Sequence, residues 1–202
     1  MPRVKVARKS TAIDMTAMCD VAFLLLTFFI LSAKPKTQDP LKAQIPAATS
    51  ITTIPETDFS TLLVANQKVF FNVESGDVRK KTLELMGLKY KINFTPEEMN
   101  EFANVEYFGV DISQLKQFLA LDPKDRATVP QNGIPVDTTD NNQLYDWVHS
   151  ARIANTALHN KDLKIGIKGD SQEEYPEIQK VIATLQKQRV NRFNLITSLK
   201  NK

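Results

Sequence analysis

The feature that most constrains this chain is an apolar run, residues 21–33, that directly follows an acidic side chain, Asp20. At about 1.5 Å of rise per residue, a helix over residues 13–33 is long enough to cross a hydrocarbon layer of about 30 Å. A carboxylate inside such a helix costs about 2.5–3.5 kcal/mol on insertion scales, and each Val, Leu, Ile or Phe of the run offsets about 0.3–0.6 kcal/mol. Together the apolar side chains offset the insertion cost of the carboxylate, with little left over. We therefore predict a transmembrane helix over residues 13–33 that holds a carboxylate inside the membrane.

Two other interpretations of this segment stay open. Residues 1–12 contain four basic side chains, and a basic segment before an apolar run also occurs in cleavable signal peptides. Removal of residues 1–33 would leave a secreted soluble protein, but cleavage favours a small residue where Leu31 stands, and signal peptides rarely carry an acid beside their apolar core. A buried helix of a soluble protein is disfavoured because residues 24–31 are apolar on every side except at Thr27.

The distribution of charge predicts how the chain is oriented. Residues 1–12 carry four Lys or Arg side chains, whereas the bases that closely follow the span are Lys34, Lys36 and Lys42. Because strongly basic flanks tend to stay in the cytoplasm, we expect a cytoplasmic tail over residues 1–12 and an exported C-terminal body. The net charge of +3 comes mainly from this tail. A nucleic-acid surface needs clustered Lys and Arg, so we expect no nucleic-acid partner.

Residue types that usually carry catalysis or metal binding are sparse. The only cysteine, Cys19, lies inside the predicted span, and the two histidines, His149 and His159, have no second ligand at metal spacing. We interpret both histidines as surface residues of a helix. The sequence has no glycine-rich phosphate loop, no nucleophile elbow and no His-Glu metal motif. We therefore expect a protein that is not an enzyme, with no metal site and no cofactor.

The chain beyond the predicted span divides into a tether and one domain. Residues 34–58 are interrupted by four prolines and are rich in Thr, Ser, Ala and Gln, which predicts an extended or disordered tether. Residues 59–202 are long enough for one exported domain with its own core. Within it, alternating apolar residues on both sides of Asn66 and Gln67 predict a hairpin, and residues 74–140 have a helical, loop-rich pattern.

The rest of the domain shows helix and strand patterns in turn. A proline, an N-cap and acids at residues 95–98 predict a helix start. Helix spacing continues over residues 140–159 and predicts a helix whose buried stripe ends at Leu158. A later helix is predicted to start at either Ser171 or Pro176. The remaining predictions are a short helix over 112–121, a loop over 122–137, a strand over 163–167 and a final strand over 193–199. This order predicts an α+β domain, in which helices cover one face of a small mixed sheet and the last two strands are parallel.

Four segments of the chain share their pattern with one known family. Residues 13–21 (IDMTAMCDV) place an Asp and a Thr before a membrane aspartate, and residues 23–29 continue the apolar span. Residues 41–47 contain an Ile-Pro pair shortly after the span, and residues 163–170 begin a strand-helix-strand unit. In these features the chain resembles the ExbD/TolR biopolymer-transport family, whose motif ahead of the aspartate often has proline where Ala17 stands.

The resemblance covers about residues 10–73 and 160–200. Residues 74–140 are longer than the compact domain of that family needs, and we interpret them as an insertion whose role the resemblance does not give. For the fold, the resemblance implies one membrane helix followed by a periplasmic α+β domain. For the function, it implies a non-enzymatic subunit of an ion-driven motor in the bacterial inner membrane, with the N-terminus in the cytoplasm.

The resemblance also implies roles for individual residues and partners. Asp20 would be the ion-carrying group. Helix spacing, independently of the resemblance, places Thr16 and Thr27 near the same face as Asp20. This polar stripe is a candidate lining of the ion path, although threonine hydroxyls in helices also bond to the backbone. In the tether, Ile45 and Pro46 would contact a partner. The implied partners are a ring subunit of the ExbB/TolQ type, an effector of the TonB or TolA type, and a second copy of this chain.

The favoured function is the use of the proton motive force, through the membrane aspartate, to energise a TonB-like effector for outer-membrane transport. One alternative is a TolR-like subunit of an envelope-integrity system. Another is a membrane-tethered periplasmic binding module in which Asp20 only pairs helices. H⁺ and Na⁺ are both candidates for the ion.

Overall fold

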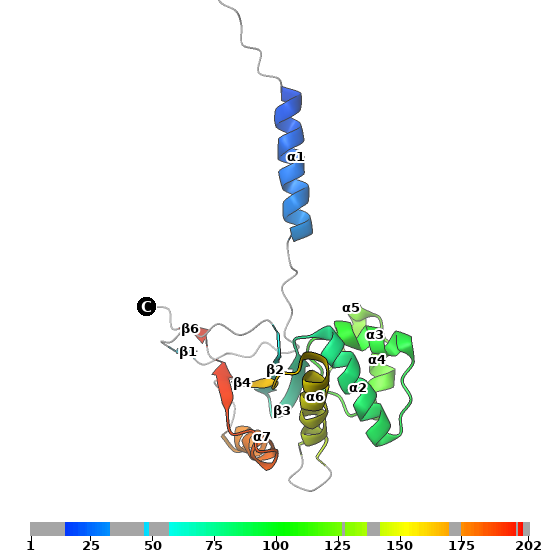
Figure 1. Cartoon of the computed structure of the whole chain (residues 1–202), viewed down its shortest axis with the longest axis vertical. Helices are drawn as coiled ribbons and strands as arrows, with labels where there is room; N and C mark the ends of the chain where they lie inside the picture. The colour runs from blue at the N-terminus through cyan, green and yellow to red at the C-terminus, as the bar shows by residue number, and fades with distance from the viewer. Residues whose placement is uncertain are drawn as a thin grey trace, which may run out of the picture. The chain divides into compact units, whose positions relative to one another are not determined.

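The structure is a computed structural model, and it describes residues 15–32, 47–48, 57–126, 128–136, 142–169, 175–196 and 198–199. The chain forms two compact units, Met1–Gln38 and Asp39–Lys202. The described part of the first unit is helix α1 (Met15–Ser32), and the second unit contains every other helix and strand (Figure 1). One apolar helix followed by a domain with a small mixed sheet and helices is the predicted fold class, which the structure confirms.

Four strands form the main sheet of the second unit, in the order β3-β2-β4-β5. The strands are β2 (Phe59–Ala65), β3 (Lys68–Val73), β4 (Lys164–Gly169) and β5 (Phe193–Ile196). β2 and β3 are antiparallel, whereas β2 pairs with β4 and β4 with β5 in parallel. Both residues of the β2–β3 turn, Asn66 and Gln67, have positive φ angles of 53° and 59°, as a two-residue type I′ hairpin requires. The predicted hairpin and the parallel pairing of the last two sheet strands are therefore confirmed.

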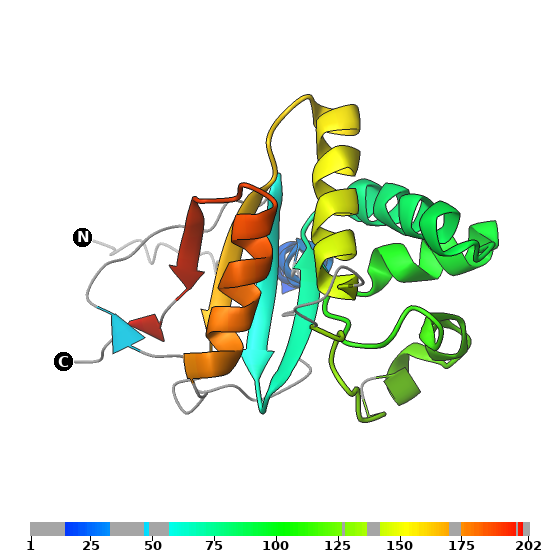
Figure 2. The same cartoon turned by 90° about the horizontal axis from the view of Figure 1, so that it is seen from below.

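Two helices, α6 (Gln143–His159) and α7 (Tyr175–Lys187), cover one face of this sheet, and Figure 1 and Figure 2 show both on the same side of the strands. α6 begins after Asn142, whose Oδ1 accepts a hydrogen bond from the Tyr145 amide at 3.1 Å and so caps the first turn. Alternate strand residues and the inner faces of both helices form one hydrophobic core, which includes Leu62, Val64, Phe71, Leu144, Trp147, Ala151, Ile165, Ile167, Val181 and Leu185.

The predicted buried stripe of α6 is wrong at its last residue. Leu158 is 48% exposed. After Ala154, which is buried as predicted, polar side chains face inward instead. Asn155 is fully buried, and its Nδ2 donates to the Lys161 carbonyl at 2.9 Å, while His159 contacts two carboxylates at the helix end. A pattern of apolar residues alone therefore places this end of α6 on the wrong face.

Residues 74–140 contribute four helices to the described part of the chain: α2 (Gly76–Tyr90), α3 (Pro96–Asn104), α4 (Leu115–Leu119) and α5 (Pro123–Arg126). α2 packs along α6, and Figure 2 shows α2 and α3 on the side of α6 away from α7. α3 starts at the predicted motif. The Thr95 hydroxyl accepts from the Glu98 amide at 3.2 Å, and the Glu98 carboxylate accepts from the Thr95 amide at 2.8 Å, which forms a capping box.

The predicted loop over residues 122–137 is wrong where α5 forms. Proline is compatible with the first position of a helix, and Pro123 opens this turn. The turn is held by Arg126, which is buried and donates to the carbonyls of Leu119 and Leu121 at 2.7 and 2.8 Å. No local sequence pattern indicates these contacts, because the acceptors are backbone carbonyls of the preceding helix and loop and the distant Glu101 carboxylate, which accepts from Arg126 Nη2 at 2.9 Å.

Aromatic packing joins these helices to the core of the domain. Phe102 of α3 stacks on Trp147 of α6 with ring centroids 5.8 Å apart, and Phe108 packs edge-on against Trp147 at 4.7 Å. All three side chains are buried. The segment 74–140 therefore shares the hydrophobic core of the sheet and α6.

The predicted strand over residues 193–199 is wrong as a single element. β5 ends at Ile196, and a separate strand, β6 (Ser198–Leu199), pairs in parallel with β1 (Ala47–Ala48). The reason is the length of β4. Ile196 pairs with Lys168, and β4 ends one residue later at Gly169, so Ser198 and Leu199 of β6 lie beyond the last residue of their neighbour in the main sheet.

Candidate functional site

Helix α1 has none of its residues buried. Its large apolar side chains from Val21 to Leu31 are between 53% and 87% exposed, and Asp20 is exposed as well. α1 is the one helix among the described residues that is long and apolar enough to cross a membrane. An apolar surface of this extent needs lipid or a partner to cover it, which argues against a core helix of a soluble protein.

Asp20 is the only charged residue of α1. At 3.6 residues per turn, Thr16 and Thr27 lie within about 40° of Asp20 around the helix axis. The Thr27 hydroxyl donates to the Leu24 carbonyl at 2.9 Å, which is the backbone bond expected of a threonine in an apolar helix. Three polar side chains therefore share one face of the helix, and the roles of Thr16 and Thr27 in an ion path stay predictions.

Of the two predicted contact residues in the tether, neither Ile45 nor Pro46 lies among the described residues. Two residues directly after them form β1, which pairs with β6 near the C-terminus. A predicted contact role for Ile45 and Pro46 is therefore untested. The same holds for the domain boundary at residue 59, although β2 begins there.

The two edges of the main sheet differ in how they are covered. On the β3 edge, Phe71 exchanges two backbone hydrogen bonds with Phe108, at 2.9 and 3.1 Å, and the Ile134 amide donates to the Val69 carbonyl at 2.8 Å. Phe108 and Ile134 both belong to the segment 74–140, which thus occupies this edge. On the opposite edge, β4 is the partner of β5 within the described residues, and Leu195 of β5 is 66% exposed. Among the described residues, β5 is therefore the edge of the main sheet that offers a strand for pairing.

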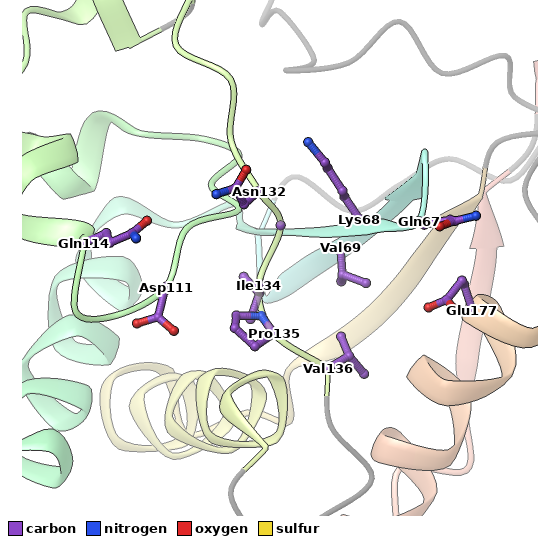
Figure 3. Close-up of a pocket in the computed structure, with 11 residues that line it drawn as sticks. Gln67, Lys68, Val69, Asp111, Gln114, Asn132, Ile134, Pro135, Val136 and Glu177 are labelled. Atoms are coloured by element: carbon purple, nitrogen blue, oxygen red, sulfur yellow. The ribbon is translucent and has the colours of Figure 1, made fainter.

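A cavity of about 310 Å³ lies between the β2–β3 turn, residues 132–136 and the start of α7. Figure 3 shows its side chains, with Val69, Val136 and Glu177 on one side and Asp111 and Gln114 on the other. Its two carboxylates are already engaged, because Asp111 accepts from Gln143 Nε2 at 2.8 Å and Glu177 accepts from Lys180 Nζ at 2.7 Å. Within the part of the chain that the structure describes, no group of three His, Cys, Asp or Glu side chains could hold a metal ion.

One cluster of charged side chains was missed by the sequence analysis. His159, interpreted as a surface residue, lies between Asp58 and Asp77, with its side chain 25% exposed. The three residues come from the start of β2, the first turn of α2 and the end of α6, so no local spacing reveals them. The available signal was the position of Asp77 in the first turn of α2 and of His159 at the end of α6, the helix ends that favour their charges. His149 is exposed and stacks on Tyr145.

Comparison with known proteins gives one match. The family model described as "Biopolymer transport protein ExbD/TolR" matches residues 7–200. No curated protein and no solved structure matches the chain. The matched range includes α1 with Asp20, the main sheet and the segment 74–140, and so covers essentially the whole chain.

Proposed function

Because the chain belongs to the ExbD/TolR family of biopolymer transport proteins, we propose that it is a non-enzymatic subunit of an ExbB-ExbD-type motor. In this proposal the motor uses the proton motive force to energise a TonB-like effector for outer-membrane transport. Family membership and a single N-terminal apolar helix fit a single-pass protein of the inner membrane. The proposed orientation places residues 1–12 in the cytoplasm and the α+β domain in the periplasm.

The observation that carries the proposal is the single carboxylate of α1. Asp20 is exposed on an apolar helix, and a carboxylate that faces lipid is unfavourable. The helix therefore needs a partner that offers a polar path, which a ring subunit of the ExbB/TolQ type would supply. Proton binding neutralises Asp20 and lets it leave that path, and proton release returns it. Alternation between these two states would convert ion flow into displacement of α1, with Thr16 and Thr27 along the same face.

The exported domain would pass this displacement to the effector. The β5 edge is suited to strand pairing, because the opposite edge is occupied by Phe108 and Ile134. We assign to this edge either a second copy of the chain or a strand of the TonB- or TolA-like effector. Ile45 and Pro46 are the proposed contact residues of the tether.

The test of this function replaces Asp20 by Asn, which keeps shape and hydrogen bonding but cannot titrate. We expect Asp20→Asn to insert and to co-purify with its ring subunit, and to lose ion-driven energisation of the effector. Asp20→Glu should retain part of that function, because a titratable carboxylate remains. Cys19→Ser, at the neighbouring position, is the matched control and should retain it.

The outcomes separate the proposal from its alternatives. Normal ion-driven function in Asp20→Asn would refute the ion-carrying role. Loss of co-purification in Asp20→Asn would show instead that Asp20 pairs helices, as in a membrane-tethered binding module. Identification of the co-purified effector distinguishes a TonB-directed from a TolA-directed system.

A further inference from the structure

Three charged side chains from distant parts of the sequence meet at one end of the sheet. His159 Nδ1 lies 2.5 Å from Asp58 Oδ1, and His159 Nε2 lies 3.1 Å from Asp77 Oδ2. A neutral imidazole has a single N–H donor, so it can donate to only one carboxylate and turns a lone pair toward the other. The imidazolium form donates to both. The arrangement of the two carboxylates therefore fits a protonated His159.

Each member of the cluster stands where a secondary-structure element begins or ends. Asp58 precedes β2, Asp77 lies in the first turn of α2, and His159 is the last residue of α6. A helix N-terminus favours an anion and a helix C-terminus favours a cation, so both helix positions carry the favourable charge. The cluster ties the start of the sheet to the ends of two helices.

Asp58 also sets how β2 lies against β4. Its φ angle is positive, at 56°, a conformation that Asp adopts more readily than most residues. Its carbonyl accepts the Lys164 amide at 2.9 Å, next to the first residue pair of the β2–β4 register. Its second carboxylate oxygen accepts from Lys161 Nζ at 3.3 Å, and the Lys161 side chain is 68% exposed. The contact with His159 is therefore the more protected of the two side-chain contacts that hold this turn.

We propose that Asp58, His159 and Asp77 form a protonation-dependent latch, which holds the start of β2 against α6 and α2 while His159 carries its proton. When His159 loses the proton at alkaline pH, one carboxylate is released and the start of β2 opens locally. Asp58 directly precedes β2, so the latch lies where the chain enters the main sheet. The latch depends on the geometry of the domain and does not require the proposed motor function.

The surroundings of the three groups define the pH range of the latch. Hydrogen bonds to Asp58 and Asp77 raise the pKa of His159 above its ordinary value of 6.5, and the hydrogen bond from His159 holds the pKa of Asp58 below 3.8. Burial acts to raise the pKa of Asp77, but hydrogen bonds from His159 and the Val78 amide leave it below 3.8. Within the described residues, Lys161 is the further charged group that faces the cluster.

The sign of the pH dependence follows from these shifts. The stabilisation by protonated His159 is fully present below pH 6.5 and is lost as the pH rises through the raised pKa. The stabilisation by the two carboxylates is present above pH 3.8 and is lost as the pH falls through their lowered pKa values. The latch is therefore closed at pH values above the lowered pKa values of the two carboxylates and below the raised pKa of His159. At higher pH it opens, because His159 loses its proton.

The first measurement is an NMR titration of the full chain in detergent micelles with labelled histidine. The chain contains two histidines, and His149, whose ring stacks on Tyr145, provides the internal reference. We expect His159 to titrate above its ordinary range, and Asp58→Asn and Asp77→Asn each to lower its pKa. A His159 titration that is unchanged in both variants would overturn the latch.

The second measurement is hydrogen exchange at the Lys164 amide, which donates to the Asp58 carbonyl. Protection, corrected for the intrinsic pH dependence of exchange, should fall several-fold as the pH rises through the measured His159 midpoint. His159→Gln has no titratable proton, so its protection should be low at every pH and show no step at the His159 midpoint. His159→Arg stays cationic, so its protection should be high at every pH and likewise show no step. A step that persists in His159→Gln, or equal loss of protection in both variants, would overturn the proposal. If His159→Gln does not fold, His159→Arg and the two Asn variants still decide it.

Discussion

Arg79 of α2 holds the segment 74–140 to the end of β3 through backbone contacts. The residue is 8% exposed. Its Nε donates to the Val73 carbonyl at 2.5 Å, and its Nη2 donates to the Glu74 carbonyl at 3.0 Å. Its Nη1 donates to the carbonyls of Ala103 and Val105 at 2.6 and 2.8 Å. One side chain thus satisfies carbonyls at the end of a strand and at the C-terminus of α3, where helix carbonyls lack intrahelical partners.

Arg79→Met removes these donors and keeps an unbranched side chain. At about 1 kcal/mol net for each hydrogen bond, the four bonds contribute about 4 kcal/mol. Burial of the guanidinium lowers the pKa of Arg79, which means that desolvation disfavours the charge at this site. Relief of that desolvation offsets part of the loss, so we expect Arg79→Met to reduce the free energy of unfolding by about 2–3 kcal/mol.

The assay is thermal unfolding of the full chain in detergent, followed by tryptophan fluorescence. Trp147 is the single tryptophan and is fully buried against Phe102, so its emission reports the core that the segment 74–140 shares. At about 2–4 °C for each kcal/mol in a chain of this size, Tm should fall by about 4–12 °C in Arg79→Met. Lys80→Met, at the adjacent exposed position, is the matched control and should shift Tm by less than about 2 °C. Equal Tm values for the two variants would refute the stabilising role of the four bonds.

Two backbone positions give further predictions. Gly166→Ala should lower the free energy of unfolding by about 1–3 kcal/mol, because a Cβ would lie 2.6 Å from Phe59 Cζ and 2.9 Å from Ile196 Cδ1. Gly169→Ala, whose Cβ would meet its nearest neighbour at 3.4 Å, is the control in thermal unfolding, and equal losses would contradict the steric argument. Lys91→Gly should raise the stability by about 0.5–1 kcal/mol, because the residue after α2 has a φ of 56°. The urea midpoint measures this gain, and an equal gain in Lys91→Ala would show that φ is not the cause.

Elements that depend on consecutive residues were predicted from the sequence. The β2–β3 turn needs two residues with positive φ, and Asn66 with Gln67 between two apolar runs supplied that signal. The start of α3 needs an N-cap and an acid three residues later, which Thr95 and Glu98 provide. The carboxylate in α1 was equally visible, because the bilayer selects its segments by length and composition.

Elements that depend on distant contacts were not predicted. α2 has no clear apolar stripe, because Arg79 and Thr82 are buried beside Val78 and Leu83, and polar residues that face inward hide the helical period. The Asp58–His159–Asp77 cluster joins three separate elements, and its members show no spacing in the sequence. The position of Ser198 and Leu199 outside the main sheet depends on the length of β4, which the residues of β5 and β6 do not encode.

The coverage of the two sheet edges restricts how a second copy of the chain could pair. Phe108 and Ile134 occupy the β3 edge, so, of the two edges of the main sheet, β5 is the one that the described residues leave for strand pairing between copies. A two-fold axis places the same edge of both copies together, and two β5 strands related by such an axis run antiparallel. The pair would join two four-stranded sheets into one continuous sheet, with the segment 74–140 of each copy at an outer end.

A TonB- or TolA-like strand that uses the same β5 edge would compete with this pairing. Cysteines placed along β5 in a Cys19→Ser background would therefore cross-link either between copies or to the effector at any one time, and cross-linking to both at once from the same strand would contradict a shared edge.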